Sequence, residues 1–566
     1  MISYWLLFLA FLPLLLVPVL FYWAQWPKAQ TMPLACLSAA VIAFIFWGVE
    51  FAQVTASVVY GLLRSAEIIV YIFCALFFFQ VVRLSGIHTV IRETFSRIHP
   101  DRRVQAILIA WFFGSFLESV MGFSATGAVC SLLLMGIGFP PACAAMLGLM
   151  GPMTASSFCA LGMPITYGVA NGLQQPSFWG QLTAAGMDMD GYLRLVTAQA
   201  AILHGIVGTF MPLGMVMFVT RYFGRNQSWR EGLEVAPFAL FAGLAFTVPY
   251  VLTAVFFGPE FPSLAGSLIG AALTFFVAET GVLTPSKKWD FPPENEWGLD
   301  WVVRKYHKIQ PRGSMLPLMA WLPFLLLAVF MAVSRFPELP LAGFLKSYTL
   351  EWPSLLGTEI GIRMQPLFVP SSLCLLAVSV IGFFYLRLNV ESLQHMARAT
   401  MIPLWEAVLN ILFVMPLMAL YTYSDVNAYN NPSMLQVVAS WIGSLWGSQL
   451  WGPFFMPFFS ALGSFLVGNN TLCNLAFAWL QHNLSGGFDV PCTMLMALQV
   501  VGASIGNMLA THYLVGSCVA VGMLGWGGPI GRKALRLALW YALAVSVVGM
   551  ILVYFNVGEF VQRMIR

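Results

Sequence analysis

The sequence has few charged residues: they make up 9% of its 566 positions, whereas hydrophobic residues make up 59%. Soluble domains carry about 25% charged residues, so a water-soluble fold is excluded. A membrane-spanning helix needs roughly 20 mostly apolar residues, and the chain has room for about 12 to 14 such helices. The composition therefore predicts an all-α polytopic membrane protein.

Motifs for catalysis and for metal binding are also missing. The nine cysteines show no CxxC or Cys/His ligand spacing, so neither a metal nor a cofactor is expected. The sequence has no HExxH, no pair of Asp-rich motifs and no Ser/His/Asp arrangement with supporting context. A membrane-embedded enzyme is therefore the less favoured alternative to a carrier.

Lysine is absent from the apolar segments, because all seven lysines lie in or beside hydrophilic stretches. A proton-pumping respiratory subunit would carry buried lysines along its helices, and a channel would need a filter or a pore ring. Both functions are therefore less favoured than a carrier.

Basic residues gather in segments 85–104, 221–234, 284–313 and 532–536. Cytoplasmic loops of membrane proteins are enriched in Lys and Arg, so we place these four segments in the cytoplasm. Nothing in the composition indicates a nucleic-acid partner.

The sequence contains one short motif in two copies. The tetrapeptide Gly-Ser-Phe-Leu occurs at 114–117 and again at 463–466, each time inside an apolar stretch. Each copy is followed by a break of small and polar residues, at 118–127 and at 467–474. Paired interruptions in matching positions are typical of transporters built from inverted repeats, whose site lies near the middle of the membrane.

The duplication divides the chain into two halves. We expect an N-terminal transmembrane half over residues 1–283, with a re-entrant helical hairpin at about 105–138. A cytoplasmic polar connector over 284–315 leads to a C-terminal transmembrane half over 316–566, with its hairpin at about 452–484. Each hairpin is followed by an interrupted helix, and the two pairs should face each other as two inverted repeats.

The breaks are predicted to bind an anion. Irregular backbone at membrane depth persists only where it is buried in protein or faces a watery cavity, and the N-terminus of a restarting helix carries partial positive charge. The candidate substrate-binding residues lie at the breaks or in the interrupted helices: Gly122, Phe123, Ser124, Thr126, Thr154, Ser156, Asn469, Asn470, Thr471, Asn474, Asn507 and Thr511.

Ionisable residues inside apolar spans are functional candidates, because they are costly to place there. Glu118 lies directly before the first break. A carboxylic acid kept from water holds its proton more readily, so Glu118 is a candidate for proton coupling, with a purely structural role as the alternative. His512, beside the second site, is a second candidate for proton coupling. His204 is interpreted as a core histidine satisfied by hydrogen bonds.

The stretch from Ala110 to Ser124 resembles the lactate permease family, whose pattern reads close to GAFLEGAAGFG. The resemblance returns at 463–481, where the family has a GxFLTGSxTSSNxLF-like run, and it covers nearly the whole chain. It implies a secondary transporter in the cell (inner) membrane that takes up lactate or glycolate with protons. The residues that match the motifs are Glu118, Gly122, Phe123, Gly468, Thr471 and Asn474.

The departures from the pattern make this chain a divergent member. Ser119-Val120-Met121 replaces a run of small residues, and Asn507 stands where the family's GKMISPQS-like segment has a lysine. A keto acid, a sulfonate or a dicarboxylate therefore remains an alternative substrate, and Na⁺ an alternative coupling ion. The sequence leaves open whether the carrier is a homodimer and whether one domain moves as an elevator or rocks.

Overall fold

The structure is a computed structural model that describes residues 4–20, 26, 28–122, 125–302, 316–336, 338–368, 372–445, 451–488, 490–523, 525–558 and 561–562. Within these residues the prediction of an all-α polytopic membrane protein is confirmed. Six helices are long and apolar enough to cross a membrane, and the number rises to eight if two bent helix pairs each count as one span. Shorter apolar helices of 10–17 residues accompany them.

The first half contains the following elements: α1 (Tyr4–Pro18), α2 (Lys28–Ile45), α3 (Phe51–Ser85), α4 (Ile87–Ile98), α5 (Arg102–Ala106), η2 (Ile107–Phe113), α6 (Gly114–Met121), α7 (Ala125–Gly136), α8 (Pro141–Met150), η3 (Gly151–Met153), η4 (Ala155–Phe158), α9 (Cys159–Met163), η5 (Pro164–Val169), α10 (Ala170–Gly172), α11 (Pro176–Ala184), α12 (Met189–Gly208), α13 (Met211–Phe223), α14 (Trp229–Leu233), α15 (Ala236–Phe257) and α16 (Pro262–Thr280). The run α5–η2–α6 is continuous from Arg102 to Met121, and every residue in it after Arg102 is buried.

The second half follows the short helix η6 (Glu294–Glu296). Its elements are α17 (Pro317–Val333), α18 (Pro340–Ser347), β1 (Leu350–Trp352), β2 (Ile362–Met364), α19 (Ser372–Tyr385), α20 (Val390–Thr422), α21 (Met434–Leu445), α22 (Trp451–Val467), α23 (Asn470–Phe488), α24 (Cys492–Asn507), α25 (Thr511–Ala520) and α26 (Gly527–Tyr554). β1 and β2 pair antiparallel, with Glu351 opposite Arg363, and form the only strands among the described residues.

Prolines and glycines set many helix boundaries. Pro141, Pro262 and Pro317 stand at the first turn of α8, α16 and α17, where a missing backbone N–H is tolerated. Gly86 and Gly281 end α3 and α16 in the left-handed conformation, which glycine adopts without steric cost. The apolar chain is therefore divided into helices by local backbone chemistry, since its hydropathy alone is nearly continuous.

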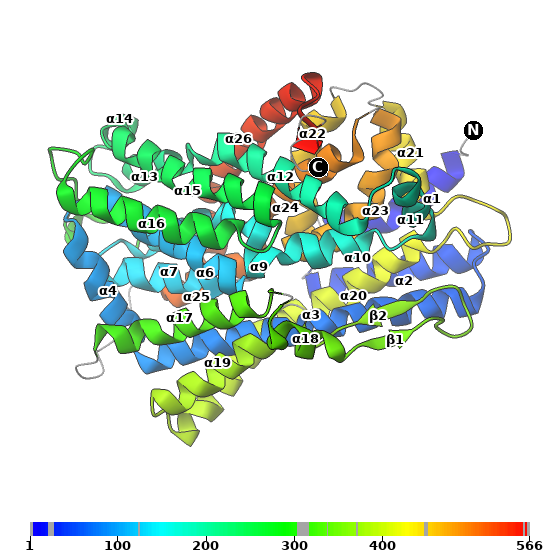
Figure 1. Cartoon of the computed structure of the whole chain (residues 1–566), viewed down its shortest axis with the longest axis horizontal. Helices are drawn as coiled ribbons and strands as arrows, with labels where there is room; N and C mark the ends of the chain where they lie inside the picture. The colour runs from blue at the N-terminus through cyan, green and yellow to red at the C-terminus, as the bar shows by residue number, and fades with distance from the viewer. Residues whose placement is uncertain are drawn as a thin grey trace.

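The long helices α3 and α20 lie side by side along the molecule and pack against each other (Figure 1). α12, α15 and α16 lie on the opposite side of the molecule in this view, and α6, α7, α9 and α25 lie between the two layers. α25 packs on α7 and α8, while η5 packs on α23. Each half therefore places an interrupted helix against the hairpin of the other half.

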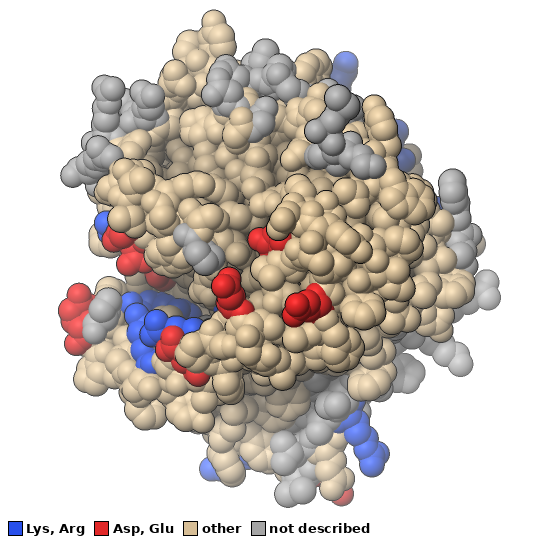
Figure 2. Space-filling model, turned by 90° about the vertical axis from the view of Figure 1, so that its right-hand side faces the viewer, with Lys and Arg blue, Asp and Glu red and all other residues tan. Residues whose placement is uncertain are grey.

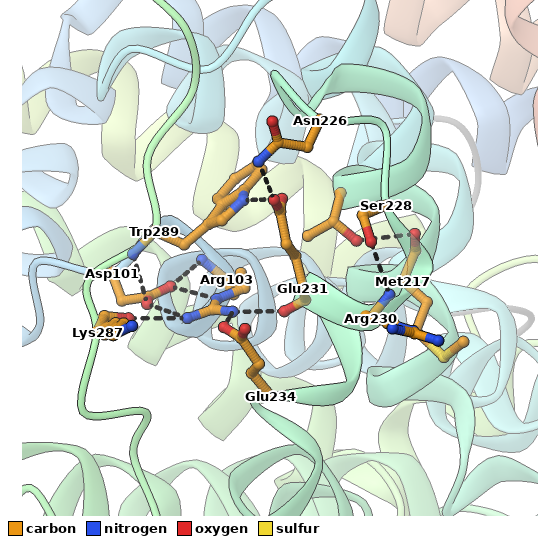
Figure 3. Close-up of polar contacts among 11 residues, drawn as sticks. Asp101, Arg103, Met217, Asn226, Ser228, Arg230, Glu231, Glu234, Lys287 and Trp289 are labelled. Carbon is orange, nitrogen blue, oxygen red and sulfur yellow. Dashed lines mark hydrogen bonds and ion pairs between the residues drawn. The ribbon is translucent and has the colours of Figure 1, made fainter.

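The connector is fastened to the first half at one end of the molecule. The fully buried side chain of Arg103 forms an ion pair with Asp101 at 2.8 Å and donates to the carbonyl oxygens of Glu231 and Lys287 at 2.5 and 3.1 Å (Figure 3). The indole of Trp289 donates to the Glu231 carboxylate at 2.7 Å. The described part of the connector, residues 284–302, therefore packs against this end of the first half.

Candidate functional site

The first break ends a buried helix at a glycine. α6 stops at Met121, and Gly122 has φ +56° and ψ −173°, a conformation that only glycine adopts readily. A Cβ atom there would collide with the hydroxyl of Tyr71 in α3. That hydroxyl donates a hydrogen bond to the carbonyl of Met121. A helix end that lies in an apolar interior is thus satisfied by one tyrosine.

The second break is built in the same way. α22 ends at Val467, Gly468 has φ +96°, and Asn410 in α20 donates through Nδ2 to the Val467 carbonyl at 2.8 Å. The Oδ1 atom of Asn469 accepts the N–H of Thr471 at 2.7 Å and so caps α23. In both breaks, a polar side chain from one of the two long packed helices holds the last carbonyl before the glycine.

Glu118 lies one turn before the first break and is 0% exposed. The hydroxyl of Tyr513, in the first turn of α25, lies 2.7 Å from each of its two carboxylate oxygens. A phenol carries one hydrogen, so it satisfies one of these oxygens at a time. None of the ion pairs found in the described part of the chain involves Glu118. A carboxylate buried without a cation is costly, and a bound proton removes that cost.

Ser156 joins the two halves. Asn470, at the start of α23, donates through Nδ2 to the carbonyl of Ser156 at 2.5 Å and to its hydroxyl at 3.1 Å. Asn507, at the end of α24, donates to the same hydroxyl at 2.8 Å. Cys159 lies 3.9 Å from the Asn470 Oδ1 atom, and its sulfur would be 3.5 Å from a Cβ atom at Gly122. The two breaks therefore meet around one short segment.

The segment that carries Ser156 is itself interrupted. Ala160, Leu161 and Gly162 have φ values of +45°, +52° and +77°, a left-handed run that is costly for the two residues with a Cβ atom. The helix axis also bends by 54° just before Ser156, between the segments Pro141–Met153 and Ala155–Gly172. In the second half, α24 ends at Asn507 and α25 begins at Thr511. Each half thus contributes one hairpin break and one broken helix to the same region.

Two predicted residues contact other parts of the interior. Asn474 donates through Nδ2 to the carbonyl of Pro164 at 3.1 Å, which ties α23 to the segment after the bend. Thr154 belongs to a different polar group: its hydroxyl lies 3.3 Å from that of Tyr541, and its carbonyl accepts the hydroxyl of Tyr250 at 3.1 Å. Thr154 is therefore separate in its hydrogen bonding from the cluster around Ser156.

The remaining predicted residues are placed less fully. Thr126 is completely buried in the first turn of α7, and His512 is half-buried with its ring 5.2 Å from that of Tyr513. Phe123 and Ser124 lie outside the described residues, and of Thr511 only the backbone is described. His204 is hydrogen-bonded through both ring nitrogens, to Ser157 at 2.8 Å and to Tyr541 at 2.7 Å, in agreement with its interpretation as a satisfied core histidine.

The sequence did not single out three residues that complete this geometry: Tyr71, Asn410 and Tyr513. Tyr513 directly follows two nominated residues, Thr511 and His512, and that position was a usable signal. Tyr71 and Asn410 each lie in the middle of a long helix, where nothing local marks them. Neutral groups dominate the site, since no hydrogen bond described for Ser156, Asn470 or Asn507 involves Lys or Arg.

Known permeases are similar to this chain along most of its length. The chain matches a family described as L-lactate permease over residues 7–556. It is 26% identical to the L-lactate permease of Bacillus subtilis (strain 168), with 94% of each chain covered. It is also 26% identical to the glycolate permease GlcA of Escherichia coli (strain K12), with 90% of this chain and 88% of the relative covered. These relatives are named permeases, which confirms the prediction of a transport protein rather than an enzyme.

Among solved structures, the chain is similar to the YdaH transporter of Alcanivorax borkumensis. The TM-score is 0.38 and the sequence identity 14%, over 86% of this chain and 85% of the other.

Proposed function

Because the chain belongs to the L-lactate permease family, we propose that it is a secondary active carrier of a small monocarboxylate, lactate or glycolate, driven by proton symport. As a member of this family, it is an integral membrane protein that crosses the bilayer several times. We further propose that residues 1–283 and 316–566 are two inverted repeats, joined by a cytoplasmic connector over 284–315.

One observation carries the proposal: two glycine-ended breaks from opposite halves meet around Ser156. There the amides of Asn470 and Asn507 donate to a single serine, and α23 and α25 begin beside the cluster. Helix N-termini and neutral amide donors stabilise an anion without a cationic side chain. Such a site suits one negative charge better than two, which favours a monocarboxylate over a dicarboxylate.

Glu118 is the proposed proton carrier. An anion that crosses the low-dielectric interior alone is strongly disfavoured, and a proton that travels with it makes the moving complex neutral. Glu118 is buried, accepts a hydrogen bond from the Tyr513 phenol with the Thr126 and Ser156 side chains also beside its carboxyl group, and lies one turn from the first break. Protonation of its second oxygen satisfies the carboxyl group while the substrate is bound nearby.

The proposed substrate contacts are the residues of the two breaks and of the broken helices: Gly122, Phe123, Ser124, Thr126, Ser156, Asn469, Asn470, Thr471, Asn507 and Thr511. Thr154 and Asn474 position the backbone around them, through the contacts described above. His512 lies beside Tyr513, where it can pass a proton toward Glu118.

Transport by the purified protein in liposomes tests the function. We expect an alkaline interior to drive accumulation of labelled L-lactate or glycolate, with proton entry reported by an internal pH dye. One proton per monocarboxylate predicts that an imposed membrane potential has little effect. Accumulation of only a sulfonate or a dicarboxylate would contradict the substrate class. Uptake driven by a Na⁺ gradient at constant pH would contradict the coupling ion.

A further inference from the structure

A second group of charged residues lies away from the Ser156 cluster, around a cavity of about 490 Å³. Four basic residues line it, Arg64, Arg335, Lys346 and Arg363, against two acidic ones, Glu67 and Asp190. We call this cavity the basic vestibule. Figure 2 shows the end of the molecule that carries α11 and the β hairpin, with Lys and Arg side chains gathered in a hollow between acidic ones.

Arg64 forms the buried part of the basic vestibule. It comes from the middle of α3, and its side chain is 2% exposed. Its Nη1 atom donates to Glu67 and to the carbonyl of Arg363, each at 3.1 Å, and its Nε atom donates to Tyr60 at 3.4 Å. The hydroxyl of Tyr167 donates to the same carboxylate oxygen of Glu67 at 2.6 Å. Arg64 is therefore fixed in position on one side of its guanidinium.

The Nη2 side of the Arg64 guanidinium is the side that we assign to a ligand. Among the described residues, the Nη2 atom of Arg64 has no hydrogen-bond partner, and neither has the second carboxylate oxygen of Glu67. Donors of a buried guanidinium are costly to leave unsatisfied. A carboxylate is the small anion whose geometry an arginine matches with two parallel hydrogen bonds. The cavity volume is within the range of small-molecule sites.

The outer part of the basic vestibule is also built for a negative charge. Arg335 and Lys346 both lie over the ring of Phe368, with 4.5 and 4.8 Å to its centre. Arg363 is exposed on β2 and extends from the hairpin toward the cavity that it lines. Because Glu67 is paired with Arg64, the other three cations of the lining outnumber the exposed carboxylate of Asp190. Glu260, just outside the lining, interacts with Arg335 and Lys346 and offsets part of their charge. The electrostatic potential inside should therefore attract anions.

The basic vestibule shares one chain segment with the candidate site. Met163, Thr166 and Tyr167 line it, and they follow directly after the left-handed run at Ala160–Gly162. Ser156 and Cys159 lie just before that run, in the cluster that joins the two breaks. A substrate leaving the vestibule along this segment would thus reach the cluster where the broken helix bends.

We propose that the basic vestibule is a separate capture site, in which Arg64 binds the carboxylate of the substrate before it moves to the Ser156 cluster. The inference rests on the proposed function, since it assumes that the transported solute is a small carboxylate. Lys346 and Arg363 raise the rate of capture by attraction at the rim, whereas Arg64 makes the direct contact.

Uptake by reconstituted protein at several salt concentrations tests this capture site. The rim variant Lys346→Gln/Arg363→Gln should raise KM with little change in kcat, so that kcat/KM falls about tenfold at low salt. The loss should shrink as salt rises toward about 1 M, where screening reduces the attraction. Lys288→Gln, an exposed lysine of the connector at the other end, is the matched control and should keep the wild-type KM and salt dependence.

Arg64 needs a variant that preserves folding. Removing Arg64 alone would leave Glu67 as an unpaired buried charge, so the pair is replaced together as Arg64→Gln/Glu67→Gln. We expect this double variant to fold, to raise KM about tenfold or more, and to lose the stabilisation by lactate in a thermal-shift assay. Wild-type KM and salt dependence in both double variants would overturn the capture site. The wild-type arm reports separately on the proposed function, which fails if no monocarboxylate is taken up.

Discussion

Glu118 is the residue on which proton coupling depends most directly. In Glu118→Gln the side-chain volume and a hydrogen bond with Tyr513 can be retained, but no proton can be taken up and released. We expect the variant to fold, to lose uptake driven by a pH gradient, and to keep exchange of substrate across the membrane at equal pH. Proteoliposome uptake and counterflow measure the two activities separately.

The control for this variant is Glu279→Gln, which changes an exposed glutamate near the end of α16. It should keep wild-type pH-driven uptake. If Glu118→Gln also accumulates substrate in response to a pH gradient, Glu118 does not carry the coupled proton.

Asn470 offers a second test at the scale of one side chain. Asn470→Ala removes two hydrogen bonds to Ser156, each worth about 1 kcal/mol, and removes an amide from the proposed substrate contacts. We expect an apparent KM about tenfold higher, measured as initial uptake at varied substrate concentration. Asn483→Ala is the matched control in the same helix, because the hydrogen bond described for Asn483 goes to the backbone of its own helix, at Trp479. An unchanged KM in Asn470→Ala would place Asn470 outside the substrate site.

The residues that local pattern could identify were those inside the two breaks. Glu118, Asn470 and Asn507 stand out because polar groups are rare in such an apolar chain. Tyr71 and Asn410 could not be identified, since their role depends on which carbonyl a distant helix places beside them. Thr154 and Ser156 are only two residues apart, but they join different networks because short 3₁₀ turns replace the regular helix there.

At the scale of elements, each of the two hairpins is held by a hydrogen bond from a long neighbouring helix. α3 closes the first break through Tyr71, and α20 closes the second through Asn410. α3 and α20 also pack against each other, so the two breaks share one support. The duplicated tetrapeptide predicted matching hairpins, but not this support, because α3 and α20 show no comparable repeat in the sequence. The common support holds both breaks in the same part of the interior.

The glycines of the two breaks should be irreplaceable for this reason. Gly122→Ala and Gly468→Ala each put a Cβ atom on a residue with positive φ, which costs about 1–3 kcal/mol, and in Gly122→Ala that atom also meets Tyr71. We expect lower thermal midpoints for both variants in detergent, with the larger loss for Gly122→Ala. Gly486→Ala is the control, because it lies in helical conformation with open space around it. Wild-type stability of Gly122→Ala would mean that the break can rearrange.

At the scale of the whole molecule, the two ends carry different kinds of charge. The connector end holds ion pairs, such as Arg103 with Asp101 and Lys533 with Asp300. The opposite end holds the basic vestibule, where cations outnumber acids. The polar connector was visible as the longest polar stretch of the sequence. The basic vestibule could not be predicted from the sequence. Its cations come singly from α3, α18, β2 and the segment after α17, and only the fold brings them together.

The orientation of the molecule decides what the basic vestibule faces. If the connector is cytoplasmic, as its basic residues predict, then the vestibule opens outward, where an imported anion first meets the protein. Ser354→Cys places a thiol in the exposed loop between β1 and β2, and Lys288→Cys places one in the connector. Eight of the nine native cysteines are buried and the ninth is partly so, which keeps background labelling low. A membrane-impermeant maleimide should therefore label Ser354→Cys in intact cells, and Lys288→Cys only after permeabilisation. The reverse pattern would turn the vestibule toward the cytoplasm and make it a release site, since a carrier that imports an anion meets its cytoplasmic cations last.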